Sequence, residues 1–150
     1  MNETIKKFLT DNLLGVIATQ NGTHIESAAV YYGFDDGFSI YLNTHTASRK
    51  FKNIEQNPNV SFVVYQQNPA MTLQLEGTIE SITEVSKITE IYDTLLRRTL
   101  AQGTIPPIHQ IQSGETALLK ITPTWARFAD FSQGTTIKPG TFTMLVGEEK

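Results

Sequence analysis

Two short turns divide the first third of the chain into consecutive strands, and they constrain the fold more than any other feature. Asn21-Gly22 lies between two long segments, and both residues tolerate the positive φ angles that a tight hairpin requires. Asp35-Asp36-Gly37 forms a second turn of this kind. The segments around these turns predict three strands that form an antiparallel meander, at residues 13–19, 24–34 and 38–44.

Beyond the meander, helical and strand periodicity alternate along the chain. Apolar residues recur at helical spacing over residues 2–12, over residues 47–56 before Asn57-Pro58, and over residues 84–101. Three further strands are predicted at residues 60–65, at 71–82 with a bulge or bend at Gly77, and at 116–131, broken or bent at Pro123. Gly103 ends the last helix, and the isoleucines of the loop 103–114 indicate that it lies on an apolar surface. The final residues are predicted to be loose.

The order of these elements predicts the fold class. Six strands, mostly sequential, and three helices favour a mainly β fold, a six-stranded antiparallel barrel, closed or split, whose ends are plugged by helices. A doubly wound fold fits poorly because the helices do not alternate with the strands. A chain of 150 residues has the size of one ordinary domain, so we expect a single domain over residues 1–150.

The composition excludes several classes of function. The chain has no cysteine, which excludes disulfides and thiolate metal sites, and its three histidines lack metal-ligand spacing, so no metal is expected. A net charge of -3 gives no reason to expect nucleic acid or an anionic membrane as a partner. No apolar run approaches the roughly 20 residues of a membrane span. We therefore expect a soluble, cytoplasmic protein.

The segment before the second helix is the most informative for chemistry. Thr44 or Thr46 is a plausible N-cap for this helix, because a threonine hydroxyl can accept a hydrogen bond from a first-turn amide. Either cap places Ser48, Arg49 and Lys50 in the first turn or just after it.

Basic residues are unfavourable at this end of a helix, since the N-terminus is the positive pole of the helix dipole. Arg49, Lys50 and Lys52 nevertheless crowd it, and no acidic residue follows in the sequence until Glu55. A bound anion would resolve the conflict, because first-turn amides, a hydroxyl, a guanidinium and an ammonium together suit a phosphate. The alternative is that the cations simply point into solvent. The residues alone leave both interpretations open.

A family resemblance bears on this choice. The strand IYLNT followed by SRKFKNIEQNPNVSFVVY resembles the pyridoxamine-phosphate-oxidase-like family of FMN-binding split barrels, in a match over roughly residues 13–83. The chain looks most like the short, general-stress-protein-like branch of that family. The resemblance implies an FMN cofactor held in the cleft of a homodimer.

The resemblance also implies a set of site residues. Arg49 and Lys50 would hold the FMN phosphate, strand 27–32 would run beside the isoalloxazine, and residues 71–73 would contribute, often across the dimer interface. Trp125 would either cover a flavin edge from the partner subunit or belong to the barrel core or interface. The implied cofactor-binding residues are Ser27, Ala28, Ala29, Val30, Asn43, Thr44, Ser48, Arg49, Lys50, Met71, Thr72 and Trp125.

The sequence departs from true pyridoxamine phosphate oxidases at positions that serve their substrate. Ser27 and Tyr32 stand where those enzymes carry basic residues, and Met71-Thr72 replaces an Arg-Gln pair. The chain ends in TMLVGEEK, without the Arg and His motif that grips the substrate phosphate. These departures disfavour pyridoxamine phosphate oxidation more than they disfavour FMN binding.

Three functions follow as hypotheses. The first is an FMN-dependent oxidoreductase that acts on a small organic substrate, with a nicotinamide as one conceivable electron donor; no catalytic side chain is assigned, since the flavin carries the chemistry. The second is a non-catalytic protein that binds or senses flavin. The third is a haem- or deazaflavin-binding relative built on the same barrel.

Overall fold

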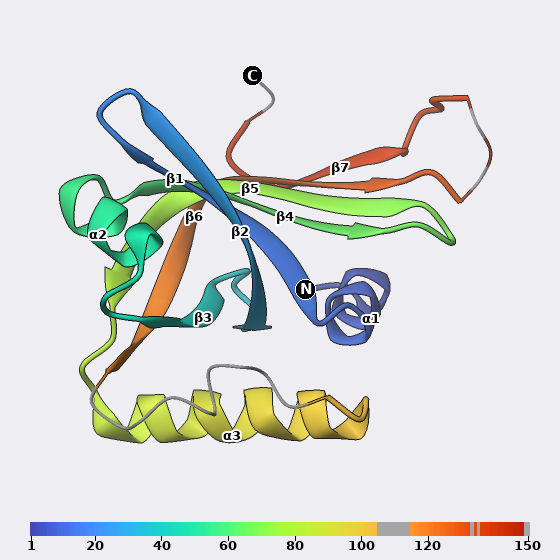
Figure 1. The fold of residues 1–150 in the computed structure, drawn as a ribbon. Coiled ribbons are helices and arrows are strands. Elements are labelled where there is room, and N and C mark those ends of the chain that lie inside the picture. Colours follow the sequence, from blue (N-terminus) through green and yellow to red (C-terminus); the bar gives the residue numbers. More distant parts are fainter. Residues whose placement is uncertain (105–114, 133, 135, 149–150) are drawn as a thin grey trace.

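The computed structural model describes residues 1–104, 115–132, 134 and 136–148. The predicted helices and six predicted strands are present, with ends that agree to within about two residues. In chain order (Figure 1) the elements are α1 (Glu3–Asp11), β1 (Leu14–Asn21), β2 (His24–Phe34), β3 (Ile40–His45), α2 (Arg49–Gln56), β4 (Asn59–Gln66), β5 (Met71–Ser81), α3 (Val85–Ala101), β6 (Thr116–Asp130) and β7 (Phe142–Val146).

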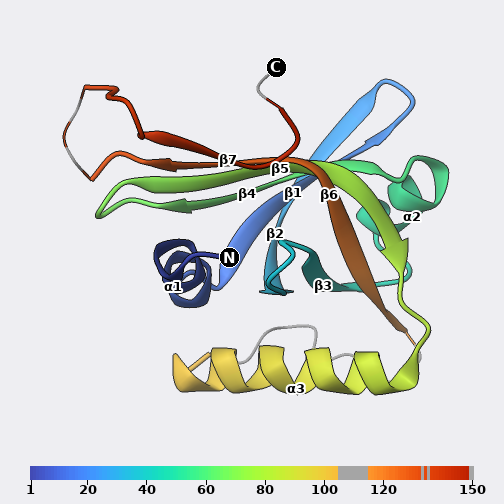
Figure 2. The ribbon, with the colours of Figure 1, turned by 180° about the vertical axis from the view of Figure 1, so that it is seen from behind.

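The strands form one antiparallel sheet that closes on itself. Their order is β3-β2-β1-β4-β5-β6-β7, and β3 also pairs with β6, which closes a barrel of six strands. The predicted six-stranded antiparallel barrel is thereby confirmed. Figures 1 and 2 show α3 lying along one side of the barrel and β7 outside the closure, beside β6.

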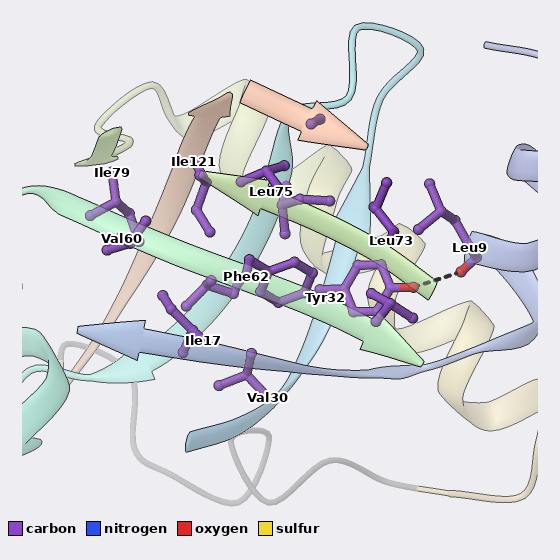
Figure 3. Packing of buried hydrophobic residues seen from close by; sticks show 14 of the residues in the cluster. Leu9, Ile17, Val30, Tyr32, Val60, Phe62, Leu73, Leu75, Ile79 and Ile121 are labelled. Atoms are coloured by element: carbon purple, nitrogen blue, oxygen red, sulfur yellow. Dashed lines mark hydrogen bonds between the residues drawn. The ribbon is translucent and has the colours of Figure 1, made fainter. Parts of the chain in front are cut away.

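The barrel core arises from the period-2 alternation of the strands and from two helices at its ends. At its centre the ring of Phe62, 2% exposed, packs edge to face against Tyr32 at 5.3 Å (Figure 3). The Tyr32 hydroxyl donates to the carbonyl of Leu9 in α1 at 3.1 Å. A Cβ at Gly15 would lie 2.1 Å from Phe62 Cζ, so the glycine in β1 makes room for this ring. Other buried residues of the barrel core include Ile17, Ile40, Leu42, Ile54, Val64, Leu73, Leu75, Leu119 and Ile121.

The prediction of loose final residues is wrong for Phe142–Val146, which form β7. The strand pairs with β6 antiparallel, and the Phe142 ring meets that of Phe131 edge to face at 5.8 Å. Glycines with φ of +87° and +74° at Gly140 and Gly147 bound the strand. A strand of 5 residues carries little periodic signal, and its pairing with β6 is a long-range contact.

Of the bulge or bend predicted at Gly77, the structure has a bulge in the pairing of β5 with β6. The register of β5 with β6 shifts there: Glu76 lies opposite Trp125, whereas Gly77 lies opposite Pro123, which leaves one extra residue on β6. A Cβ at Gly77 would lie 2.3 Å from the carbonyl oxygen of Thr122, so glycine permits the close approach. Proline has no N–H group to donate to the sheet, and the register shift between β5 and β6 falls at Pro123. The strand β6 therefore continues through Pro123 without ending.

Helix α3 packs on the outside of the barrel through the predicted apolar stripe. Ile91 and Leu95 are buried in a second cluster with residues of β3 and β6, while Val85, in the first turn, is 76% exposed. Gly103, with a φ of +71°, follows the helix as predicted. Residues 105–114 of the predicted apolar loop lie outside the described residues. Within the described part of the chain, no helix is both long and apolar enough to cross a membrane.

Arg98 ties α3 to the rest of the fold. Its guanidinium donates to the carbonyls of Tyr32 at 2.8 Å, Leu9 at 2.6 Å and Thr10 at 3.2 Å. Leu9 and Thr10 end α1, where helix carbonyls lack intrahelical partners. One side chain therefore holds together α1, β2 and α3.

Candidate functional site

Helix α2 begins at Ser48, which corrects the predicted cap at Thr44 or Thr46. The Ser48 hydroxyl accepts from the amide of Phe51 at 3.2 Å. Thr44 lies within β3 and is 1% exposed, and the Thr46 hydroxyl donates to the carbonyl of Glu115 at 3.2 Å. Because β3 runs on to His45, the helix can start only after the following turn. Arg49 and Lys50 thus occupy the first two helical positions.

Lys50 is a half-buried cation that contacts hydroxyl groups. Its ammonium donates to Thr44 Oγ1 at 2.9 Å, and that oxygen lies 3.1 Å from Ser48 Oγ. Burial lowers the pKa of Lys50, and the charge of Glu26 partly opposes this effect. Among the described residues, no carboxylate lies within ion-pair distance of the Lys50 ammonium. The cluster therefore holds a partly desolvated positive charge without a bonded counter-ion.

Arg49 lies on the solvent side of the same helix turn. Its side chain is 84% exposed, and its Nη2 lies 3.4 Å from Oε1 of Glu26 in β2. The expectation that Glu55 is the first nearby acid is therefore wrong in space, although it holds along the sequence. The barrel brings the β1–β2 hairpin against α2, and this tertiary contact has no local sequence signal.

A cleft of about 380 Å³ lies between the hairpin and α2. The helix is fixed there by Asn53, whose amide donates to Thr19 Oγ1 at 3.1 Å. Thr19 is the cross-strand partner of Glu26, so these side chains belong to the same end of the barrel. The cleft is lined by Asn21, His24, Ile25, Glu26, Arg49, Lys52 and Asn53.

This helix start fits a phosphate group. The amides of Arg49 and Lys50 lie in the first turn, where no intrahelical carbonyl can pair with them. Beside them are the Ser48 and Thr44 hydroxyls, the Lys50 ammonium and the Arg49 guanidinium. Donors of this kind suit a phosphomonoester, and the half-buried Lys50 charge favours an anion.

The implied flavin-contacting residues of β2 divide between two faces of the sheet. Ser27 and Ala29 are exposed on the outer face, whereas Ala28 is half-buried and Val30 is 7% exposed inside the barrel. Only Ser27 and Ala29 therefore present their side chains to a ligand on the outer face.

Asn43 and Thr44 also point in opposite directions, as neighbours in a strand must. Thr44 faces Ser48 and Lys50, but the Asn43 Oδ1 accepts from the Tyr92 hydroxyl of α3 at 2.7 Å. The Asn43 Nδ2 is buried and has no hydrogen-bond partner among the described residues. The structure thus brings Thr44, but not the Asn43 side chain, to the helix start.

Met71 and Thr72 are the first residues of β5, and this strand begins at the other end of the barrel from α2 (Figure 1). Met71 pairs with Gln66 and Asp130, and Gln66 in turn bonds Asn12 just before β1. The helix start, by contrast, lies beside the far end of β1, so one chain does not bring both groups together.

Trp125 lies on β6 at the bulge, and its indole nitrogen donates to the carbonyl of Glu148 at 3.1 Å. The Arg127 guanidinium stacks over the indole at 5.5 Å and donates to Oε1 of Gln74 at 2.9 Å. Trp125 is therefore part of a cluster that joins β5, β6 and the segment after β7.

The fold and the helix start define a small antiparallel barrel with a candidate phosphate site at one end. A family model described as pyridoxamine 5'-phosphate oxidase matches residues 1–130. The chain belongs to this family. No curated protein matches the chain.

Solved structures share the fold. The conserved hypothetical protein Rv2991 of Mycobacterium tuberculosis has 21% identity and a TM-score of 0.71, with 94% of each chain covered. General Stress Protein 26 of Bacillus anthracis has 23% identity and a TM-score of 0.64, over 84% of this chain and 91% of that one. A haem binding protein of Mycobacterium smegmatis has 14% identity and a TM-score of 0.68, over 96% of this chain and 58% of that one.

Proposed function

We propose that the protein binds FMN, with the phosphate at Ser48, Arg49 and Lys50, and acts as an oxidoreductase on a small organic substrate. The observation that carries this proposal is the half-buried Lys50 ammonium, which contacts the Thr44 hydroxyl and no carboxylate among the described residues. The family to which the chain belongs includes flavin-binding proteins. When bound, the isoalloxazine would supply the electron transfer.

The chain's own residues would bind and orient the cofactor. Lys50 and Arg49 would donate charge-assisted hydrogen bonds to the phosphate, and the Ser48 hydroxyl has a proton to donate while it accepts from the amide of Phe51. Because α2 is fixed to β1 through Asn53, these donors are held on a rigid element before the ligand arrives.

The visible spectrum tests the choice of cofactor. We expect the purified protein, as isolated or after addition of FMN, to show flavin absorption bands that stay with the protein through gel filtration. A Soret band would instead favour a haem protein, like the neighbour from Mycobacterium smegmatis. A protein that stays colourless after incubation with FMN would contradict the proposal. If flavin binds, turnover with a reductant would separate an oxidoreductase from a flavin-binding or sensing protein.

We also propose that the protein is a homodimer joined through the outer face of β1, β2 and β4. This face exposes large apolar side chains, with Leu14 at 50%, Val16 at 40%, Ile25 at 73% and Tyr65 at 62%. Strand register places all four on the same side of the sheet. Exposed apolar patches of this kind mark interaction surfaces. Met71, Thr72 and Trp125 of one subunit could then lie near the start of α2 in the other subunit, although Met71 and Thr72 do not reach the start of α2 in their own chain.

Light scattering should therefore report twice the 16.7 kDa chain mass over a range of concentrations. Val16→Asp would place a charge in the interface and should shift the mass to that of one chain. Val85→Asp is the matched control, because Val85 is 76% exposed on α3, and it should leave the dimer intact. A monomeric parent protein that still binds FMN would contradict the shared site.

A further inference from the structure

An acidic side chain lies beside the two cations of the candidate phosphate site. Glu26 of β2 is 24% exposed, and its Oε1 lies 3.4 Å from Arg49 Nη2. Its charge also acts on Lys50, where it opposes the effect of burial on the pKa. Glu26 shares the inward side of the barrel with its cross-strand partner Thr19, which bonds Asn53 of α2. The carboxylate is therefore held at the helix start by the barrel itself.

A carboxylate in this position opposes the binding of a phosphate. Two anions that share one guanidinium repel each other, and the repulsion is weakly screened over a few ångströms. Arg49 can give its full hydrogen-bonding capacity to a phosphate only when it leaves Glu26. Lys50 has no bonded carboxylate among the described residues, so Glu26 acts on it only at a distance and does not occupy its hydrogen bonds.

We propose that Glu26 is a built-in competitor for the cofactor phosphate, which occupies Arg49 in the ligand-free protein and keeps the flavin exchangeable. This inference rests on the proposed FMN site and adds a residue that limits its affinity. It assigns the two cations different roles: Lys50 provides a constant attraction for the phosphate, and Arg49 alternates between Glu26 and the ligand.

Replacement of Glu26 by glutamine tests the proposal, with FMN and riboflavin titrated by quenching of flavin fluorescence. Glu26→Gln should tighten FMN binding roughly 3- to 30-fold, the size of one partly screened charge interaction, and slow FMN release in stopped flow. Riboflavin affinity should change less than about twofold, because riboflavin has no phosphate to compete. Glu55→Gln, the same charge change at an exposed position of α2, should leave both affinities unchanged.

The Arg49→Met background identifies the mechanism. If Glu26 competes for Arg49, the gain from Glu26→Gln should shrink in that background to the part that direct repulsion between Glu26 and the phosphate contributes; a gain that persists in full would overturn the competitor role. Unchanged FMN affinity in the single variant would also overturn it. An equal affinity for FMN and riboflavin in both the parent protein and Glu26→Gln would instead contradict the phosphate site, so the two failures are distinguishable.

Discussion

Replacement of Phe62 by alanine should lower the free energy of unfolding by about 3–5 kcal/mol, the range for a large aromatic truncated in a core. The Phe62 ring is 2% exposed, packs edge to face with Tyr32 and fills the space over Gly15, so its removal leaves a cavity between two strands. Urea denaturation followed by circular dichroism measures the loss. Phe62→Leu should show a smaller loss of the same sign.

A double substitution makes this test specific to the Gly15 contact. Gly15→Ala alone should destabilise the protein by about 1–3 kcal/mol, because the new methyl group overlaps the Phe62 ring. In the Phe62→Ala background the same change should cost much less. Val85→Ala, at a position 76% exposed, should stay within about 0.5 kcal/mol. A loss below about 1 kcal/mol for Phe62→Ala would contradict the described core.

Removal of the charge of Lys50 should weaken FMN binding by about 1.5–3 kcal/mol, or roughly 10- to 150-fold, as expected for a charge-assisted hydrogen bond. Lys50→Met keeps the aliphatic stem and deletes the ammonium that contacts Thr44. Riboflavin binding should be almost unchanged, since riboflavin has no phosphate. Arg49→Met should weaken FMN binding in the same range.

Lys7→Met is the control, because Lys7 carries the same charge at an exposed position of another helix, α1. It should change FMN affinity less than about threefold. The ligand-free Lys50→Met protein should unfold at the same temperature as the parent or slightly above it, since a cation leaves the positive end of a helix. A loss of stability with unchanged FMN affinity would make Lys50 a structural residue.

Local sequence features were sufficient to predict most of the fold. The turn between β1 and β2 falls one residue later than the Asn21-Gly22 pair predicts: Asn21 still pairs with His24, and Gly22, with a φ of +58°, and Thr23 make the turn that sets the register of the two strands. Apolar segments bounded by turn residues mark the barrel strands. The bulge at Gly77 was also predictable, because a glycine interrupts a long strand. The strand β7 was missed because its 5 residues are stabilised by pairing with β6, which no local pattern reveals.

The candidate site was predictable only where it leaves a local signal in the sequence. Three cations at a helix start are a local anomaly, and the structure places Lys50 beside Thr44 and Ser48. Glu26 was not identified, because it approaches Arg49 only once the hairpin packs against α2. The one sequence signal for this role of Glu26 is that a charged residue occupies an inward-facing position of β2, two residues before Ala28.

The central claim, that this helix start recognises the phosphate of FMN, is tested most directly by titration of the parent protein with FMN and with riboflavin under the same conditions. The two ligands differ only in the phosphate, so their affinity ratio isolates what Ser48, Arg49 and Lys50 contribute. We expect FMN to bind at least about tenfold more tightly, since two charge-assisted hydrogen bonds exceed the competition from Glu26. Equal dissociation constants would contradict the claim.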